Sequence, residues 1–187
     1  MQKLIGWAVL LLCAVAPLSA QDTSRFDISA GYTFVRSNAP PGACGCFSMN
    51  GTDASGAYNL TRYLGVVGDF SAVHAGNVNA SGQGLTLTSY LFGPQVSVPV
   101  HSRFRPFGHV LVGGVHAGGL GYGGAGAPDN AFAAAVGGGV DWQVNRSFSV
   151  RLFEADYYLT HFQNGANSEE NNLRLSFGVV FHIGKKK

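Results

Sequence analysis

The sequence alternates apolar and polar residues with a period of two, over runs much longer than an ordinary β-strand. In the run 25–36, five apolar side chains share one face: Phe26, Ile28, Ala30, Tyr32 and Phe34. The runs 131–143 and 172–184 follow the same pattern. Such alternation predicts strands with one apolar face. Each run has about 11 residues, roughly twice the length of a typical soluble strand, and this length matches a tilted strand that crosses a lipid bilayer.

Five further segments are interpreted as strands, which brings the predicted total to eight. They are 52–61, 64–75, 85–97, 105–117 and 147–162. In the last segment the apolar phase changes near Leu152 and Phe153, and a single β-bulge there would keep Arg151, Glu154 and Asp156 on one polar face. Segment 85–97 shows no clear alternation, so its two faces are not predicted.

The connections between the predicted strands alternate in length. Long connections, rich in small and polar residues, fall at 37–51, 76–84, 118–130 and 163–171. Shorter connections fall at 62–63, 98–104 and 144–146. Long loops at one end and short turns at the other are typical of a barrel with extracellular loops and periplasmic turns. The sequence therefore predicts an all-β fold: a transmembrane antiparallel up-and-down β-barrel of eight strands.

Composition decides which face of these strands meets which environment. Only 12% of the 187 residues are charged, 46% are hydrophobic and 27 are Gly. A soluble barrel would show charges to water, whereas a membrane barrel presents apolar side chains to lipid and turns small polar ones inward. Aromatic residues near the strand ends predict two girdles at the membrane surfaces: Phe34, Phe132 and Phe162 at the loop ends, and Tyr58, Trp142, Phe148 and Phe181 at the turn ends.

Residues 1–20 are interpreted as a secretory signal peptide. Lys3 precedes a short apolar core, and small residues end at Ala20 before the polar Gln21. The core is shorter than the roughly 20 residues that a spanning helix needs. We therefore expect a signal peptide (1–20), the β-barrel (21–184) and a basic tail (185–187).

The charge of the predicted barrel argues against a nucleic acid as a partner. Between Gln21 and Gly184 the chain has eight Arg, no Lys and all ten acidic residues. The basic residues form no stripe with interleaved aromatic side chains, which is the usual footprint of nucleic-acid binding.

Four segments carry a resemblance to a known family. They are GAYNLTRYLGVVGDFSA (56–72), YLFGPQVSV…RPFGHVLVGGVHAG (90–118), RLFEADYYLTHF (151–162) and LRLSFGVVFHIG (173–184). Together with the export signal and the alternation, they make the chain resemble the small bacterial outer-membrane β-barrel family of OmpA/OmpX type, a porin-like β-barrel domain. The resemblance implies an outer-membrane location, contact with outer-membrane lipids and insertion by the barrel-assembly machinery. We expect no cofactor and no metal, and the extracellular ligand of the loops is not predicted.

One polar cluster is predicted inside the barrel. Arg151, Glu154 and Asp156 on one strand and Arg174 on the next would face the lumen together, and Asp27 would join them across the closing seam. Charges in a dry barrel are costly unless they are paired. We therefore expect a salt-bridge network that fixes the packing and blocks the pore, rather than a catalytic site.

Two cysteines in the first long loop predict a local disulfide. Cys44 and Cys46 are separated by one Gly, and thiols in an oxidising compartment usually pair. An inter-chain bond and free thiols remain alternatives. Metal binding is not expected, because cysteine metal sites usually have about four ligands and no His lies nearby in the sequence.

An enzymatic alternative depends on His161. Outer-membrane lipid A deacylases place a His two residues before a nucleophilic Ser, but Gln163 occupies that position here, and an amide is not activated by a His. Ser168 with Glu169 or Glu170 would need a loop rearrangement. The run Gly119 to Gly124 matches a dinucleotide motif, but a strand follows it where a helix is required.

The sequence therefore favours a non-enzymatic barrel with a structural or surface-binding role in the cell envelope. A lipid A-modifying enzyme and a narrow pore for small solutes remain the alternatives.

Overall fold

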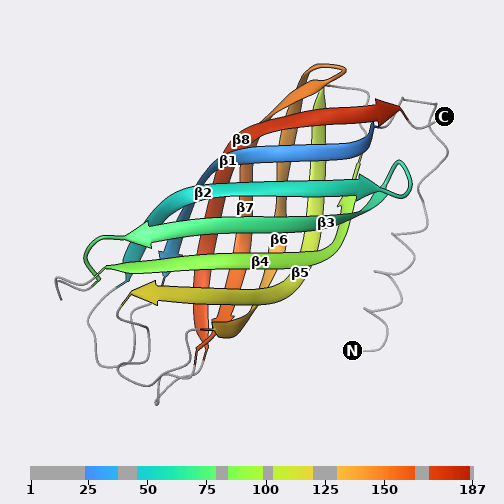
Figure 1. Cartoon of the computed structure of the whole chain (residues 1–187). Coiled ribbons are helices and arrows are strands. Elements are labelled where there is room, and N and C mark those ends of the chain that lie inside the picture. Colours follow the sequence, from blue (N-terminus) through green and yellow to red (C-terminus); the bar gives the residue numbers. More distant parts are fainter. Residues whose placement is uncertain are drawn as a thin grey trace, which may run out of the picture.

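The chain forms a closed barrel of eight antiparallel strands, in which each strand pairs with its neighbours in sequence and the last strand pairs with the first (Figure 1). This computed structural model describes residues 24–37, 46–78, 84–98, 103–119, 130–162 and 169–185. The strands are β1 (Ser24–Ser37), β2 (Phe47–Asn59), β3 (Leu64–Ala75), β4 (Leu85–Ser97), β5 (Phe104–Gly119), β6 (Asn130–Asn145), β7 (Phe148–His161) and β8 (Glu170–Lys185). The predicted fold class and strand number are confirmed.

No helix in the described part of the chain is long and apolar enough to span a membrane. Residues 1–23 lie outside the described ranges, as do 186 and 187. The signal peptide and the basic tail therefore stay predictions.

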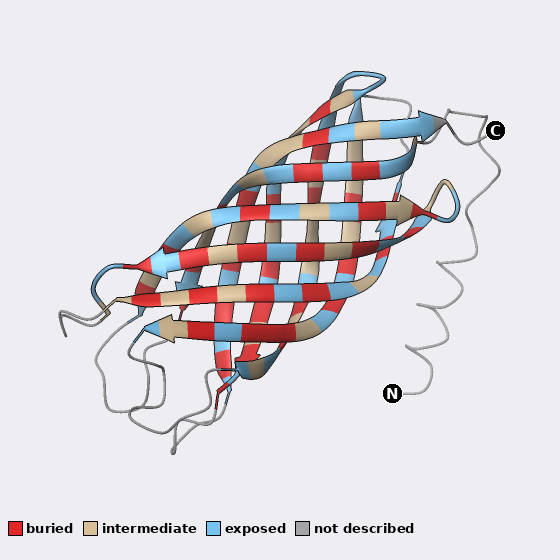
Figure 2. Ribbon diagram, in the orientation of Figure 1, coloured by how far each residue is buried: buried red, intermediate tan, exposed pale blue. Residues whose placement is uncertain are grey.

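Residues predicted to face lipid point outward, and burial alternates along every strand (Figure 2). Ile28, Phe70 and Phe177 are each about half exposed. Most of the predicted girdle residues also point outward, but Phe162 is an exception, because its side chain is only 2% exposed and packs inside the barrel. The bilayer-facing wall is thus apolar outside and largely polar inside.

The predicted bulge in β7 is confirmed by the pairing register. Against β8 the register shifts between Arg151 and Glu154, and against β6 it shifts at Val140 and Asp141. Because the bulge adds a residue to β7, the charged side chains on both sides of it point into the lumen.

The first long connection is shorter than predicted, because β2 begins at Phe47 rather than at residue 52. The added segment was missed because its pattern is reversed. Phe47 and Met49 point into the lumen, whereas Ser48 and Asn50 point outward.

The same reversal occurs on other strands near the loop end. Inside, this end is filled by apolar side chains, which we call the apolar layer: Val35, Phe47, Met49, Val73, Leu85, Leu87, Val115, Ala117 and Phe162. Outside, the wall at this level is polar, with Arg36 beside Val35 and His74 beside Val73. A barrel in water has this arrangement, whereas a barrel in lipid has the opposite one.

Candidate functional site

Arg174 on β8 is the centre of a charged layer that fills the middle and the turn end of the lumen. Its side chain is 1% exposed. Nη1 donates to Asp69 Oδ1 at 2.6 Å, and Nε and Nη2 lie 2.9 and 2.8 Å from Asp156 Oδ2. The guanidinium also lies 5.7 Å from the ring centroid of Tyr158. Arg174 therefore links β8 to its neighbour β7 and, across the lumen, to β3.

Arg151 on β7 forms the second ion-paired centre of the charged layer. Its Nε donates to Asp141 Oδ1 at 2.9 Å, and Nη1 donates to Glu154 Oε2 at 2.6 Å. The guanidinium also stacks over the ring of Phe107, 4.4 Å from the centroid. Glu154 connects the two centres, because its Oε1 lies 3.8 Å from Arg174 Nη2. The structure thus places four of the five predicted lumen residues together.

Asp27, the fifth predicted residue, lies in a separate cluster nearer the turns. It accepts hydrogen bonds from Arg105 Nη1 at 3.1 Å and Asn59 Nδ2 at 2.9 Å, and its Oδ1 lies 2.7 Å from His182 Nδ1. No ion pair among the described residues joins Asp27 to Arg151 or Arg174. The register explains the separation, because Asp27 pairs with His182, whereas Thr33, six residues further along β1, pairs with Ser176 beside Glu154.

Carboxylates outnumber guanidiniums in the lumen. The charged layer contains six acids, Asp27, Asp53, Asp69, Asp141, Glu154 and Asp156, and three arginines, Arg105, Arg151 and Arg174. Two histidines, His109 and His182, contact carboxylates at 2.9 and 2.7 Å. With all six carboxylates ionised, the formal charge of the layer is therefore −3 with neutral histidines and −1 with both histidines protonated. Asp53 Oδ1 is buried without a hydrogen-bond partner.

Alternation places all of these residues on the inward face, but it does not reveal their partners. Asp69 on β3 and Arg174 on β8 are 105 positions apart in the sequence. Their contact depends on closure of the barrel across its lumen, a property of the whole sheet. Arg105, His109 and His182 were likewise not predicted as network members.

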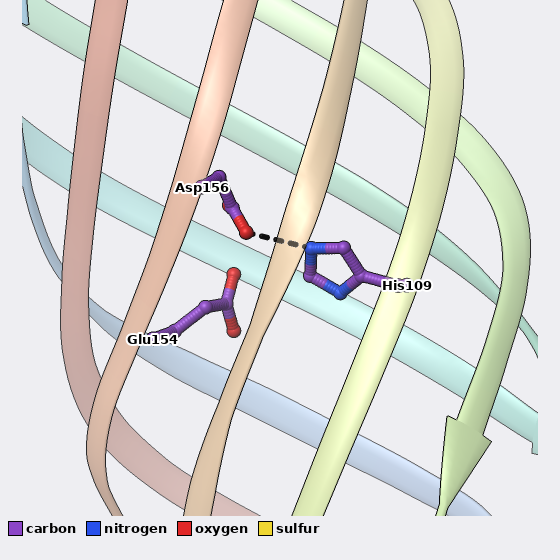
Figure 3. A group of neighbouring side chains, drawn as sticks. All are labelled: His109, Glu154 and Asp156. Atoms are coloured by element: carbon purple, nitrogen blue, oxygen red, sulfur yellow. Dashed lines mark hydrogen bonds and ion pairs between the residues drawn. The ribbon is translucent and has the colours of Figure 1, made fainter. Parts of the chain in front are cut away.

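Among the described residues, His109, Glu154 and Asp156 form a group whose ligand atoms lie close enough together to hold a metal ion (Figure 3). His109 projects from β5 toward the two carboxylates of β7, and the three ligand atoms lie within 4.8 Å of one another. Gly137 on β6 makes room for this contact, because a Cβ there would clash with Asp156.

Both carboxylates of this group already pair with a guanidinium, Glu154 with Arg151 and Asp156 with Arg174. A divalent cation would have to compete with two fixed positive charges. The contacts therefore favour an ion-pair network in which His109 is a hydrogen-bonding member.

A small polar cavity separates the Asp27 cluster from Arg151. It is lined by Asp27, Ser29, Ser55, Ala57, Gln95, Arg105, Asp141, Arg151 and Val180. Toward the loops, Arg174 and the apolar layer fill the lumen.

The residues of the enzymatic alternative lie on opposite sides of the barrel wall. His161 is exposed outside, whereas Glu170 is buried and accepts hydrogen bonds from Thr160 Oγ1 at 3.1 Å and from the backbone N–H of Phe162 at 3.3 Å. Glu169 is exposed. Gln163 and Ser168 lie outside the described residues. The described part of the chain therefore does not assemble a catalytic group around His161.

The predicted disulfide lies only partly within the described residues. Cys46 is exposed directly before β2, and Cys44 falls outside the described ranges. The pairing of the two thiols stays a prediction.

An eight-stranded up-and-down barrel with an apolar outer wall and a charged lumen defines a β-barrel membrane protein of the bacterial outer-membrane class. Residues 5–181 match the model of the outer membrane protein beta-barrel domain, and the chain belongs to this family. The protein is accordingly located in the outer membrane.

Solved structures show the same fold at low sequence identity. Ail of Yersinia pestis superposes with a TM-score of 0.59 and 17% identity, over 85% of this chain and 98% of Ail. Neisserial surface protein A gives a TM-score of 0.66 and 17% identity, over 87% of this chain and all (100%) of the other. OprG of Pseudomonas aeruginosa gives 0.59 and 12%, over 90% and 100%. A comparison with curated proteins gives no match.

Proposed function

We propose that this outer-membrane barrel is non-conducting and non-enzymatic, and that it has a structural or surface-binding role in the cell envelope. The observation that carries the proposal is the filling of the lumen by two successive layers of different chemistry. Eight-stranded barrels have an interior just wide enough for side chains to fill.

The two layers would block solutes in different ways. In the charged layer Arg174 is held by Asp69 and Asp156, and moving it aside would break several buried ion pairs. Closer to the loops, Leu87 and Val115 are almost completely buried. A hydrated ion would have to displace both layers, and removing one partner of a buried ion pair alone costs about 3–5 kcal/mol.

Because a closed lumen carries no solute, the loop end of the barrel would be the surface that binds external partners. The segments 38–45, 79–83, 120–129 and 163–168, between the described strands, would meet external partners there. Ail, a structural neighbour, has been solved in complex with the heparin analogue sucrose octasulfate. That complex supports loop binding as a role for a barrel of this shape, and we leave the ligand of this chain open.

We also propose that the chain is exported and then inserted into the outer membrane. Residues 1–20 would direct the chain out of the cytoplasm and be removed, and the barrel-assembly machinery would insert the remaining chain. Mass spectrometry of the protein from outer membranes tests this step, since a mature chain that begins at Gln21 is expected.

Single-channel recording on the reconstituted full barrel tests closure of the lumen. We expect no steady conductance from the native protein. The variant Leu87→Ala should also stay closed, because the charged layer remains in place. A steady native conductance would overturn the proposal in favour of a narrow pore for small solutes.

Incubation of the reconstituted barrel with lipid A tests the enzymatic alternative. We expect no release of fatty acid from the native protein or from His161→Ala. Release by the native protein that the His161→Ala variant loses would show that the barrel is a deacylase.

A further inference from the structure

A row of basic side chains follows the outer surface of the barrel near its loop end. The four strands that run toward the loops each contribute one residue: Arg36 on β1, His74 on β3, His116 on β5 and His161 on β7. All four are exposed, and the residue before each of them is buried in the lumen. We call these four residues the basic belt. It is not part of the lumen network, and the proposed function does not use it.

The pairing register places the basic belt at one level around the barrel. His74 pairs with Asn50, and Asn50 pairs with Phe34, two residues before Arg36. The same displacement recurs from β3 to β5 and from β5 to β7. In each step, the residue level with the new belt residue lies two positions before the previous belt residue. Strands in a barrel are tilted, so residues at one height are shifted by a constant amount from strand to strand.

The basic belt lies just beyond the apolar wall. Four residues before each belt residue, on the same face, stands a large exposed side chain: Tyr32, Phe70, Val112 and Tyr157. Four residues span about 13 Å along a strand. The belt is therefore close to the edge of an apolar band that is about 25 Å tall in barrels of this class. Because it is at the loop end, this edge is the headgroup region of the outer leaflet.

Hydrogen bonds to neighbouring strands fix three belt residues on the wall. Arg36 Nη1 donates to Ser48 Oγ at 2.8 Å. His74 Nδ1 lies 2.9 Å from Thr86 Oγ1. His116 Nδ1 lies 3.0 Å from Asn130 Oδ1. Each of these bonds uses one nitrogen of a side chain that has others.

In the part of the chain that the structure describes, acidic groups are nearly absent from this part of the outer surface. The groups that face belt residues from the neighbouring strands are neutral: Ser48, Asn50, Thr86, Thr88, Asn130, Phe132 and Leu173. Glu170 on β8, behind His161, points into the lumen. Among the described residues, Glu169 is the one exposed acid, and it precedes β8 beside His161. Arg36 thus makes the belt positive, and no described strand residue neutralises the belt from outside.

We propose that the basic belt binds the phosphate groups of anionic lipids in the outer leaflet. Arg36 supplies a permanent charge, and His74, His116 and His161 supply imidazole N–H groups that donate hydrogen bonds to phosphate oxygens. Lipid phosphates would meet one basic side chain on every second strand, so the binding is spread around the barrel.

Titration of fluorescent lipid A into the full-length barrel in a zwitterionic detergent tests the proposal. The belt variant combines Arg36→Gln, His74→Gln, His116→Gln and His161→Gln, and each substitution keeps a hydrogen-bonding group. Exposed charge pairs each change an equilibrium by up to about fivefold. At pH 6 we expect bisphosphorylated lipid A to bind the belt variant about fivefold more weakly than the native protein. Thr88→Ala, which removes a neutral outward side chain between β3 and β5, should bind like the native protein.

A comparison with a second lipid makes the result decisive. Lipid A stripped of its phosphates should bind native protein and belt variant equally. Equal binding of phosphorylated lipid to native protein and belt variant would overturn the proposal. A loss that is the same for both lipids would also overturn it, because it would come from altered packing. The single variants His74→Gln and His116→Gln should each give part of the loss, and channel recordings should be unaffected.

Discussion

The charged layer and the apolar layer fill the same lumen, yet different forces hold them together. In the charged layer, Arg174 and Arg151 are fixed by directional contacts to carboxylates on several strands. In the apolar layer, side chains such as Leu87 and Met49 are fixed by packing. The layers differ because the wall around them differs. Lipid surrounds the charged layer, whereas the wall outside the apolar layer carries polar side chains.

The largest expected effect comes from removing the central cation of the charged layer. Arg174→Met leaves Asp69 and Asp156 buried without their main counter-charge, and we expect the free energy of unfolding to fall by about 3–5 kcal/mol. Urea unfolding of the barrel in lipid vesicles measures this change. Arg25→Met is the control, because Arg25 is exposed and should cost less than about 1 kcal/mol. Equal losses for the two variants would mean that the ion pairs do not stabilise the layer.

Truncation of a packed side chain tests the apolar layer. Leu87→Ala leaves a cavity among side chains that are almost completely buried, and we expect a loss of about 2–4 kcal/mol in the same unfolding assay. Val112→Ala is the outward-facing counterpart, and its loss should be about 1 kcal/mol because lipid chains can fill the gap. If Leu87→Ala cost no more than Val112→Ala, the lumen around Leu87 would be loosely packed.

Two aspartates in the charged layer allow the stability effect of a paired carboxylate to be compared with that of an unpaired one. Asp69→Asn removes the carboxylate that receives Arg174 Nη1 and should cost about 1.5–3 kcal/mol. Asp53→Asn removes a buried charge whose Oδ1 has no hydrogen-bond partner, in a layer with too many carboxylates, and should stabilise by up to about 1 kcal/mol. Opposite signs in the unfolding assay are the expected result. A clear loss from Asp53→Asn would show that its charge is needed to balance the arginines.

The sequence predicted those parts of the fold that depend on contrast between the two faces of a strand. Alternation predicted the eight strands. The change in phase of the apolar side chains along β7 predicted the bulge at Leu152 and Phe153. Alternation cannot assign the two faces of a strand where both faces carry apolar side chains. Segment 85–97 has no readable phase because Leu85, Leu87 and Leu91 point into the lumen while Tyr90 and Phe92 point to lipid.

Side-chain contacts across the lumen also could not be predicted from the sequence. Arg151, Glu154, Asp156 and Arg174 were grouped correctly because they sit on adjacent strands. Asp27 was misplaced, because its height in the barrel depends on the register across the β1 and β8 seam, and many registers satisfy the same alternation. The start of β2 was missed because Phe47 and Met49 point inward, opposite to the pattern expected in lipid.

The place of Arg174 on the final strand bears on how the barrel closes during folding. Until β8 pairs with β1, the sheet has two open edges and Arg174 has no fixed position beside Asp69, which β3 carries far from the seam. A sheet that stopped at this stage in the bilayer would leave Asp69 without Arg174 and Asp27 without Arg105. Sealing the seam and pairing these two carboxylates are therefore coupled, and this coupling disfavours a half-closed intermediate.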